Sequence, residues 1–142
     1  MSEERLYLWK KTHGKSDQEI LELVNMLGRP TNFLNIVMNF LPEDLDPEEA
    51  EDCVIGFEVS THDRVHNLRV EISGDKCVAE RRDPQGADAT IACSLPNFVR
   101  LITDELGGVK AFMMGKLWVR GNPLFAYSIP RMFPFKEKEA VS

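Results

Sequence analysis

Residues 111–122 read AFMMGKLWVRGN, a passage in which the expected backbone structure changes twice. Residues 109–114 are long enough for one helical turn, which Gly115 ends, and residues 116–120 predict a short strand. Asn122 and Pro123 then have the residue types favoured at the N-cap and the first position of a helix. The passage therefore predicts a helix–strand–helix unit in a chain of mixed α and β structure.

The residues before this passage predict a sheet. Apolar and polar residues alternate over 54–60 and 68–72, and two more strands are expected over 77–82 and 89–94. Turn-forming residues separate the first three of these strands and follow the third, at 61–64, 73–75 and 83–86. Strands joined in this way predict an antiparallel meander with one apolar face and one wet face.

Helical spacing appears on both sides of the strands. Ser16 and Glu19 have the spacing of a capping box, apolar residues follow up to Leu27, and Gly28 and Pro30 stop that helix. A second helix is expected over residues 32–41. A third begins at residues 95–97 and closes at residues 107–108; its apolar stripe consists of Phe98, Leu101, Ile102 and Leu106.

The composition is that of a globular domain: 142 residues, 43% hydrophobic and 28% charged. A chain of this length buries roughly 70% of its unfolded surface and needs no metal or disulfide to hold a core. We expect one domain over residues 1–142, with residues 1–30 as a helical extension of uncertain role. Cys53, Cys77 and Cys93 have no CxxC spacing and lie in or beside apolar stretches, which indicates free cysteines in the core.

Charge is unevenly distributed along the chain. Residues 1–60 carry 13 acidic and 5 basic residues, whereas residues 100–142 carry 4 and 7. An acidic chain without a basic stripe is not expected to bind nucleic acid. The basic last third is either a solvated surface or a transient contact with an anionic membrane. The chain has no apolar run of about 18 residues and no signal-peptide core at its start, so we expect a cytoplasmic protein.

Nothing in the sequence indicates catalysis. The chain has three histidines, and His62 and His66 have no clear Cys or Ser nucleophile beside them. It contains no G-x-S-x-G, H-E-x-x-H or glycine-rich phosphate loop. We therefore expect a protein that is not an enzyme, with no cofactor and no metal site.

Three segments, in this order, resemble the sterol carrier protein type 2 family: residues 88–91, the helix of Phe98 and residues 111–122. That family has a D-x-T strand, an apolar helix, an A-F-x-x-G-K-L-x-V-x-G-[DN] passage and a C-terminal helix. The match covers residues 88–133, whereas residues 53–82 agree only as a pattern of strands and residues 1–30 match nothing specific. Pro130 departs from the family pattern because it falls inside the expected last helix.

The resemblance implies an α+β fold with a five-stranded, mostly antiparallel sheet and helices covering one face, enclosing an apolar cavity. The implied function is non-catalytic binding and carriage of an apolar lipid-like ligand: a sterol, fatty acid, acyl thioester or isoprenoid. Met and aromatic side chains suit a cavity that accepts varied shapes. The candidate ligand-binding residues are Phe98, Leu101, Ile102, Phe112, Met113, Trp118, Phe125, Ile129, Met132 and Phe133.

The same apolar side chains have other interpretations. They could simply fill a tight core, or they could form a homodimer or partner interface that holds no ligand. For residues 124–135 we predict a movable lid with a break near residues 129–131, because Pro130 removes a helical hydrogen bond. Arg131, Lys136 and Lys138 would bring this lid to an anionic bilayer.

Overall fold

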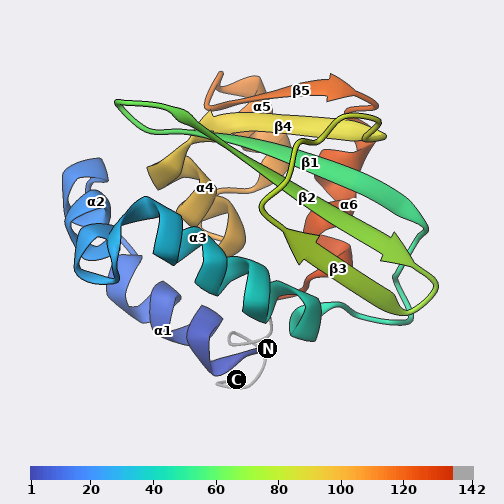
Figure 1. The fold of residues 1–142 in the computed structure, drawn as a ribbon, viewed down its shortest axis with the longest axis horizontal. Helices are drawn as coiled ribbons and strands as arrows, with labels where there is room; N and C mark the ends of the chain where they lie inside the picture. Colours follow the sequence, from blue (N-terminus) through green and yellow to red (C-terminus); the bar gives the residue numbers. More distant parts are fainter. Residues whose placement is uncertain (136–142) are drawn as a thin grey trace.

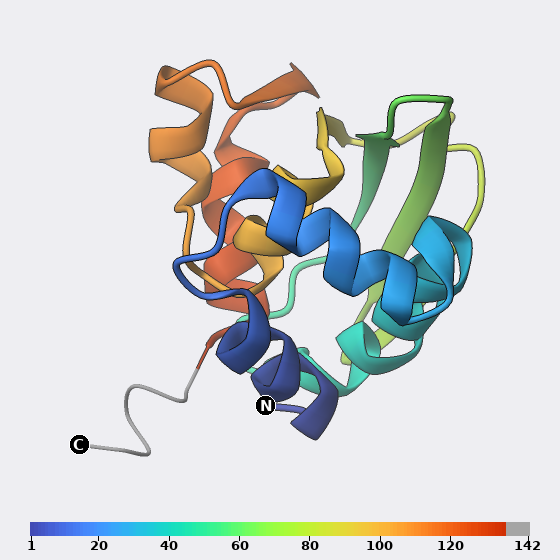
Figure 2. The same ribbon diagram turned by 90° about the vertical axis from the view of Figure 1, so that its left-hand side faces the viewer.

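The computed structural model describes residues 1–135, in which helices pack on one face of a five-stranded sheet (Figures 1 and 2). In chain order the elements are α1 (Glu3–Thr12), α2 (Asp17–Met26), α3 (Arg29–Phe40), the 3-10 helix η1 (Leu41–Asp44), β1 (Cys53–Ser60), β2 (Val65–Ser73), β3 (Lys76–Glu80), β4 (Ala89–Ser94), α4 (Leu95–Ile102), α5 (Gly108–Met113), β5 (Leu117–Gly121) and α6 (Leu124–Met132). The predicted mostly antiparallel five-stranded sheet with helices on one face is confirmed.

The strand order is β3-β2-β1-β4-β5, so the prediction of a simple meander is wrong at one point. β4 pairs with β1 in parallel, and the other three pairs are antiparallel. Residues 81–88 carry the chain from β3 across the outer face of the sheet to reach this position (Figure 1). The crossing is fixed because Pro84 is buried over Gly56, and Asp88 exchanges hydrogen bonds of 2.7 and 2.8 Å with the backbone of Val54.

The register decides which side chains face the helices. In β1, Ile55 and Phe57 are buried on the inner face, and Glu58 lies on the outer face. In β5, Leu117 is buried on the inner face, so Trp118 points outward and is exposed. Because successive side chains of a strand alternate between faces, this assignment follows directly from the pairing.

Two helices begin as the sequence predicts. The capping box of α2 is present, with Glu19 N donating to Ser16 Oγ at 3.2 Å and Ser16 N donating to Glu19 Oε1 at 3.1 Å. α4 begins after Ser94, whose hydroxyl accepts from Asn97 N at 3.3 Å. α4 ends at Ile102, earlier than expected, because Asp104 adopts a left-handed conformation with φ of 60°, which stops a helix.

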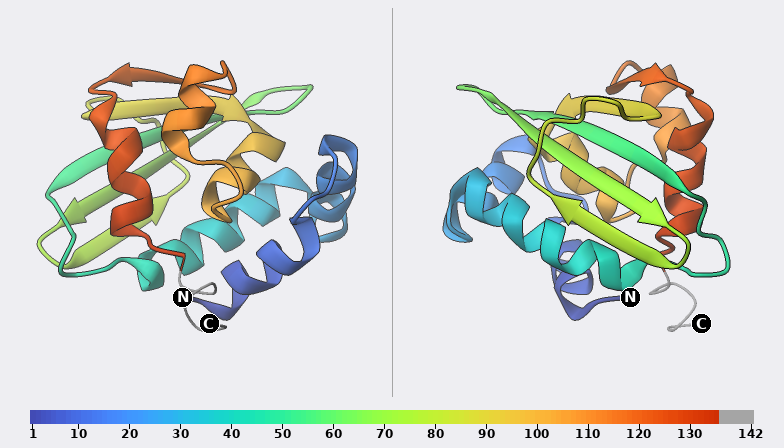
Figure 3. Two further views of the ribbon diagram at one scale, coloured as in Figure 1. Left: turned by 180° about the vertical axis from the view of Figure 1, so that it is seen from behind. Right: turned by 45° about the vertical axis from the view of Figure 1, so that its right-hand side comes forward.

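The predicted break in the last helix is also wrong. α6 continues through Pro130, and Phe133 N donates to Ile129 O at 2.8 Å across the proline. Pro130 lies in the last turns of a short helix, where it removes one hydrogen bond but leaves the following one intact. Figure 3 shows α6 running from the β5 edge of the sheet towards the start of α1.

Gly121 should be the least replaceable glycine of the β5 edge. Its φ is 88°, and an added Cβ would collide with the carbonyl oxygen of Asp88 and lie 3.1 Å from the Cα of Ala89. We expect Gly121→Ala to lower the free energy of unfolding by about 2–4 kcal/mol, since left-handed strain and overpacking add. Gly74→Ala is the matched control, with φ of 64° and open space around it, and should cost about 1–2 kcal/mol. Equal costs in urea denaturation would contradict the proposed collision.

Candidate functional site

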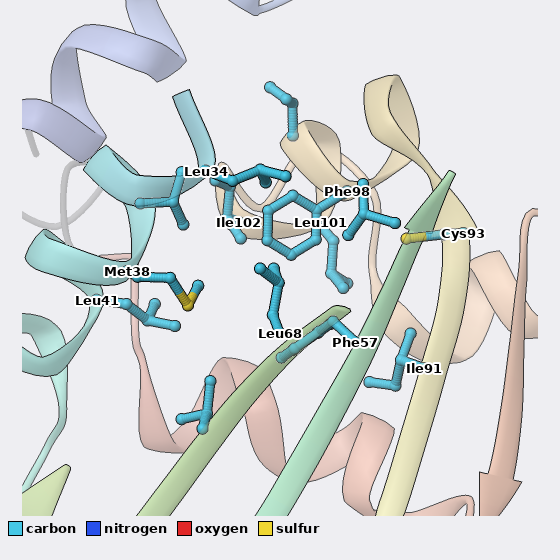
Figure 4. Packing of buried hydrophobic residues seen from close by; sticks show 14 of the residues in the cluster. Leu34, Met38, Leu41, Phe57, Leu68, Ile91, Cys93, Phe98, Leu101 and Ile102 are labelled. Carbon is cyan, nitrogen blue, oxygen red and sulfur yellow. The ribbon is translucent and has the colours of Figure 1, made fainter. Parts of the chain in front are cut away.

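A cavity of about 200 Å³ lies between the inner face of the sheet and the helices. β1, β2, α4 and the end of α6 supply most of its walls, and α1 and η1 close one side. Figure 4 shows Phe57 of the sheet and Leu101 and Ile102 of α4 in the packed interior. The lining residues are Arg5, Leu41, Ile55, Phe57, Val70, Phe98, Leu101, Ile102, Asp104, Ile129, Pro130, Phe133, Pro134 and Phe135.

The body of the cavity is apolar. Phe57 and Phe98 meet edge to face, with ring centroids 5.5 Å apart. Both rings are buried, as are Ile55, Val70 and Leu101. Strands β1 and β2 supply one wall, and helix α4 supplies the opposite wall. A ligand in this space would meet hydrocarbon on most of its surface.

One corner of the cavity is polar and is organised by Arg5 of α1. The Arg5 side chain is almost fully buried, with Nε donating to Ile102 O at 2.6 Å and Nη2 donating to Phe133 O at 2.9 Å. Nη1 donates to Pro134 O at 3.3 Å and lies 3.8 Å from Asp44 Oδ2. The guanidinium thus joins the end of α4 to the segment that follows α6.

Electrostatics explains how a charge is tolerated there. Burial lowers the pKa of Arg5, and the carboxylates of Asp44 and Asp104 oppose that effect. A guanidinium remains protonated even so, because its ordinary pKa is so high. Asp44 is itself held by Ser2, whose backbone N–H and hydroxyl donate at 2.5 and 2.9 Å. The pair is therefore hydrogen-bonded on both sides, as a buried charge requires.

The segment after α6 closes the cavity and is anchored by polar contacts. Met132 O accepts a hydrogen bond from Asp46 N at 2.7 Å, and the next two carbonyls accept from Arg5. The Phe135 ring lies under the Arg5 guanidinium at 5.5 Å and beside Trp9 at 5.8 Å, measured between ring centroids for the aromatic pair. Among residues 1–135, no strand forms backbone pairing with this segment.

The structure brings together five of the ten candidate ligand-binding residues. Phe98, Leu101, Ile102, Ile129 and Phe133 all line the cavity. Met132 is fully buried in the core and Phe125 is half-buried against it, but neither lines the cavity.

The other three candidates lie at the surface: Phe112 is 43% exposed, Met113 80% and Trp118 67%. Trp118 lies on the outer face of the sheet because its strand presents Leu117 inward. The sequence carried that signal, since Trp118 falls on the same side of the strand as Lys116 and Arg120, whereas Leu117 and Val119 fall on the other side.

Several lining residues were not among the candidates. Ile55, Phe57 and Val70 belong to the apolar sides of two predicted strands, so alternation could have found them. Arg5 had no such signal, because it stands 97 residues from the Ile102 carbonyl that it binds. Only the packing of α1 against α4 reveals its place.

The cysteines offer no activated nucleophile. Burial raises the pKa of Cys53 to about 11, with nearby carboxylates adding, and raises the pKa of Cys93 to about 12. The pKa of half-buried Cys77 is also raised to about 11, mainly by burial. All three thiols are therefore protonated at neutral pH.

We expect iodoacetamide at about pH 8 to alkylate the three thiols at least about 100-fold more slowly in the native protein than in urea, because so little thiolate is present. Mass spectrometry of quenched samples measures this, and Cys77, the least buried, should react first. Fast native labelling of Cys93 would contradict the packing described here.

Two structural features are absent from residues 1–135. No group of three or more His, Cys, Asp or Glu side chains is arranged to hold a metal ion. None of the described helices is both long enough and apolar enough to span a bilayer.

A mixed sheet covered on one face by helices, with an apolar cavity between them, defines an α+β architecture suited to holding a small apolar molecule. The sequence comparison is more specific: the SCP-2 sterol transfer family matches residues 46–133. This chain belongs to that family. The matched region includes the whole sheet and α4 to α6, and it leaves out α1, which supplies Arg5. A comparison with curated protein sequences gave no match.

Solved structures share the fold at low identity. Apo sterol carrier protein 2 from Yarrowia lipolytica is 20% identical with a TM-score of 0.52, covering 70% of this chain and 91% of that one. Sterol carrier protein 2 from Aedes aegypti, in complex with palmitate, is 18% identical with a TM-score of 0.53, covering 70% and 92%.

A third structure with this fold is part of a much larger protein. The sec-alkylsulfatase Pisa1 from Pseudomonas sp. is 13% identical with a TM-score of 0.60, covering 76% of this chain. This chain spans 17% of that enzyme's length.

Proposed function

We propose that this protein binds an apolar lipid-like molecule in the cavity between sheet and helices, and that it carries the molecule without chemical change. The observation that carries the proposal is the aromatic and aliphatic lining built by β1, β2 and α4, in a chain of the SCP-2 family. Palmitate in the Aedes aegypti protein supports the same ligand chemistry. The proposed contacts are Phe57, Phe98, Leu101, Ile129 and Phe133.

The size of the cavity indicates how a ligand would be accommodated. Sites for drug-sized ligands usually enclose about 300–1,000 Å³, whereas this one encloses about 200 Å³. A long acyl chain therefore requires a wall to move outward. The segment from Ile129 to Phe135 is the best candidate, because side-chain and backbone hydrogen bonds hold it rather than a sheet ladder. The predicted lid thus remains a proposal, now placed at the end of α6.

The polar corner limits the chemistry of the ligand. The N–H groups of Arg5 already donate to the carbonyls of Ile102, Phe133 and Pro134. A ligand would gain little by competing for these N–H groups, so we expect its affinity to come from apolar contacts between its hydrocarbon part and the cavity lining. Fatty acids, acyl thioesters, sterols and isoprenoids remain the proposed classes.

The test is direct. The purified full chain should release an apolar molecule on organic extraction, or should bind a fluorescent fatty acid with a dissociation constant near about 1 μM. Competition with a sterol, an acyl thioester and an isoprenoid quinone ranks the classes. If all of these compounds fail to bind and extraction yields no lipid, the proposal is wrong.

The membrane contact predicted for Arg131, Lys136 and Lys138 is less favoured. Arg131 pairs with Glu49 at 3.1 Å and with Glu51 at 3.0 Å, so its charge is partly neutralised. Lys136 and Lys138 lie outside the described residues. The alternative, a homodimer without a ligand, needs an exposed apolar surface, and the residues near α5 and β5 are one such surface.

A further inference from the structure

The polar corner of the cavity carries more negative charge than positive charge. Among the described residues that line the cavity, Arg5 and Asp104 are the charged ones. Asp44 lies behind Arg5, with its Oδ2 atom 3.8 Å from Nη1. The carboxylates of Asp44 and Asp104 both act on the Arg5 guanidinium through their charge. Two carboxylates around one guanidinium leave the corner with one uncompensated negative charge.

The guanidinium of this corner is already committed to the protein. Three N–H groups of Arg5 donate to the backbone carbonyls of Ile102, Phe133 and Pro134. The Phe135 ring covers one face of the guanidinium, 5.5 Å from the ring centroid. An ionised carboxylate of a ligand would have to displace a backbone carbonyl to reach this cation, and the displaced carbonyl would be left buried without a donor.

The corner does retain an acceptor that a ligand can use. Asp104 lies in the turn after α4 and is half-buried, so it stands where the cavity meets water. A carboxylate has about four lone-pair sites, so Asp104 can accept from a ligand in addition to its contacts within the protein. Hydrogen bonds to a charged acceptor are about twice as strong as those between neutral groups.

The position of the corner decides which end of a lipid reaches it. The remaining lining is hydrocarbon, supplied by residues such as Ile55, Phe57 and Leu101. A polar group buried there would lose its hydrogen bonds to water without replacement. The corner lies where the end of α6 approaches the start of α1 (Figure 3). An amphipathic lipid would therefore enter with its chain first and leave its polar group beside Asp104.

We propose that this corner selects an uncharged lipid alcohol over a lipid carboxylate, with Asp104 accepting the hydrogen bond of the ligand hydroxyl. The inference rests on the proposed function, because the ligand occupies the same cavity. A carboxylate in place of the hydroxyl would lie beside a like charge, which disfavours it. A fatty acid still binds through its chain, but more weakly than the alcohol of the same length.

Competition among three ligands with the same chain length tests the proposal on the full protein. Dodecanol, methyl dodecanoate and dodecanoate each displace Nile red, a neutral dye, at about pH 8, where dodecanoate is ionised. Because the chains match, the ratio of affinities reports on the polar group alone. We expect dodecanol to bind at least about tenfold more tightly than dodecanoate. Methyl dodecanoate, which has no charge and no donor, should lie between them.

Asp104→Asn is the diagnostic variant. The amide keeps the shape of the side chain, and Asn tolerates the φ of 60° found at this position. The variant should bind dodecanoate about tenfold more tightly than the wild type and dodecanol no more than about threefold more weakly. The control Asp63→Asn removes one negative charge from the exposed loop between β1 and β2, and it should keep the wild-type preference. Thermal melts establish that both variants are folded.

The wild type alone can overturn the proposal, by binding dodecanoate as tightly as dodecanol or more tightly. A preference in Asp104→Asn no different from that in Asp63→Asn would also overturn it. Cholesterol, added as a further competitor, separates a ring system from an open chain as the body that bears the hydroxyl; tighter binding of either alcohol than of dodecanoate supports the proposal. If neither Nile red nor any competitor binds, the cavity holds no lipid, and the proposed function itself is wrong.

Discussion

Replacement of Arg5 by methionine should lower the free energy of unfolding by about 3–5 kcal/mol, the largest stability effect we expect from a single change. The substitution keeps an unbranched apolar stem but removes the guanidinium and its buried charge. Asp44 would then be left buried without its cation, and the carbonyls of Phe133 and Pro134 would lose their donors. Urea denaturation followed by circular dichroism measures the loss.

The matched control is Arg69→Met, because Arg69 forms a 3.0 Å ion pair with Glu71 on the outer face of the sheet. That pair is partly solvated and should contribute less than about 1 kcal/mol. The double variant Arg5→Met/Asp44→Asn should lose less than the sum of its two single variants, since neither charge is then left unpaired. If Arg5→Met costs no more than Arg69→Met, the guanidinium does not anchor the segment after α6.

Placing a charge at Ile129 should weaken the binding of a fluorescent fatty acid by about 100-fold or more, because an ionised carboxylate in an apolar site costs several kcal/mol. Ile129 is half-buried and lines the cavity from α6. An aspartate there can reach water while the cavity is empty, so Ile129→Asp should still fold. Fluorescence titration alongside thermal melting separates the two effects.

Leu124→Asp provides the same chemical change at the exposed start of the same helix, and it should bind like the wild type. Phe112 and Met113 were expected from sequence to contact the ligand, but the structure places them outside the lining. Met113→Asp should therefore leave binding in solution unchanged. Equal losses at Leu124 and Ile129 would show that α6 as a whole, rather than the cavity wall, controls binding.

The local patterns of this sequence were informative wherever a structure depends on nearby residues. The capping box at Ser16, the helix start at residues 95–97 and the alternating strands all form as predicted, because each rests on contacts within a few residues. The ordered passage from residue 88 to residue 122 also indicated the family and hence the sheet with its one covered face. Helical spacing placed Phe98, Leu101 and Ile102 on one apolar stripe, and in the structure all three line the cavity.

Contacts between distant parts of the chain could not be predicted in this way. Short turns suggested that β4 would pair with β3, yet β4 pairs with β1 because residues 81–88 pack across the sheet and bury Pro84 over Gly56. Pro130 suggested a broken helix, yet α6 continues, since the hydrogen bond that follows the proline is retained.

Large apolar residues also look alike in sequence whether they line a cavity, fill a core or face water. The strand register alone turns Trp118 outward while Leu117 packs inward. The sequence therefore determined most of the elements directly and, through its resemblance to a family, the covered sheet. Only the tertiary structure decided that Arg5 closes that cavity, because its partners are carbonyl oxygens, which every residue carries and no sequence pattern distinguishes.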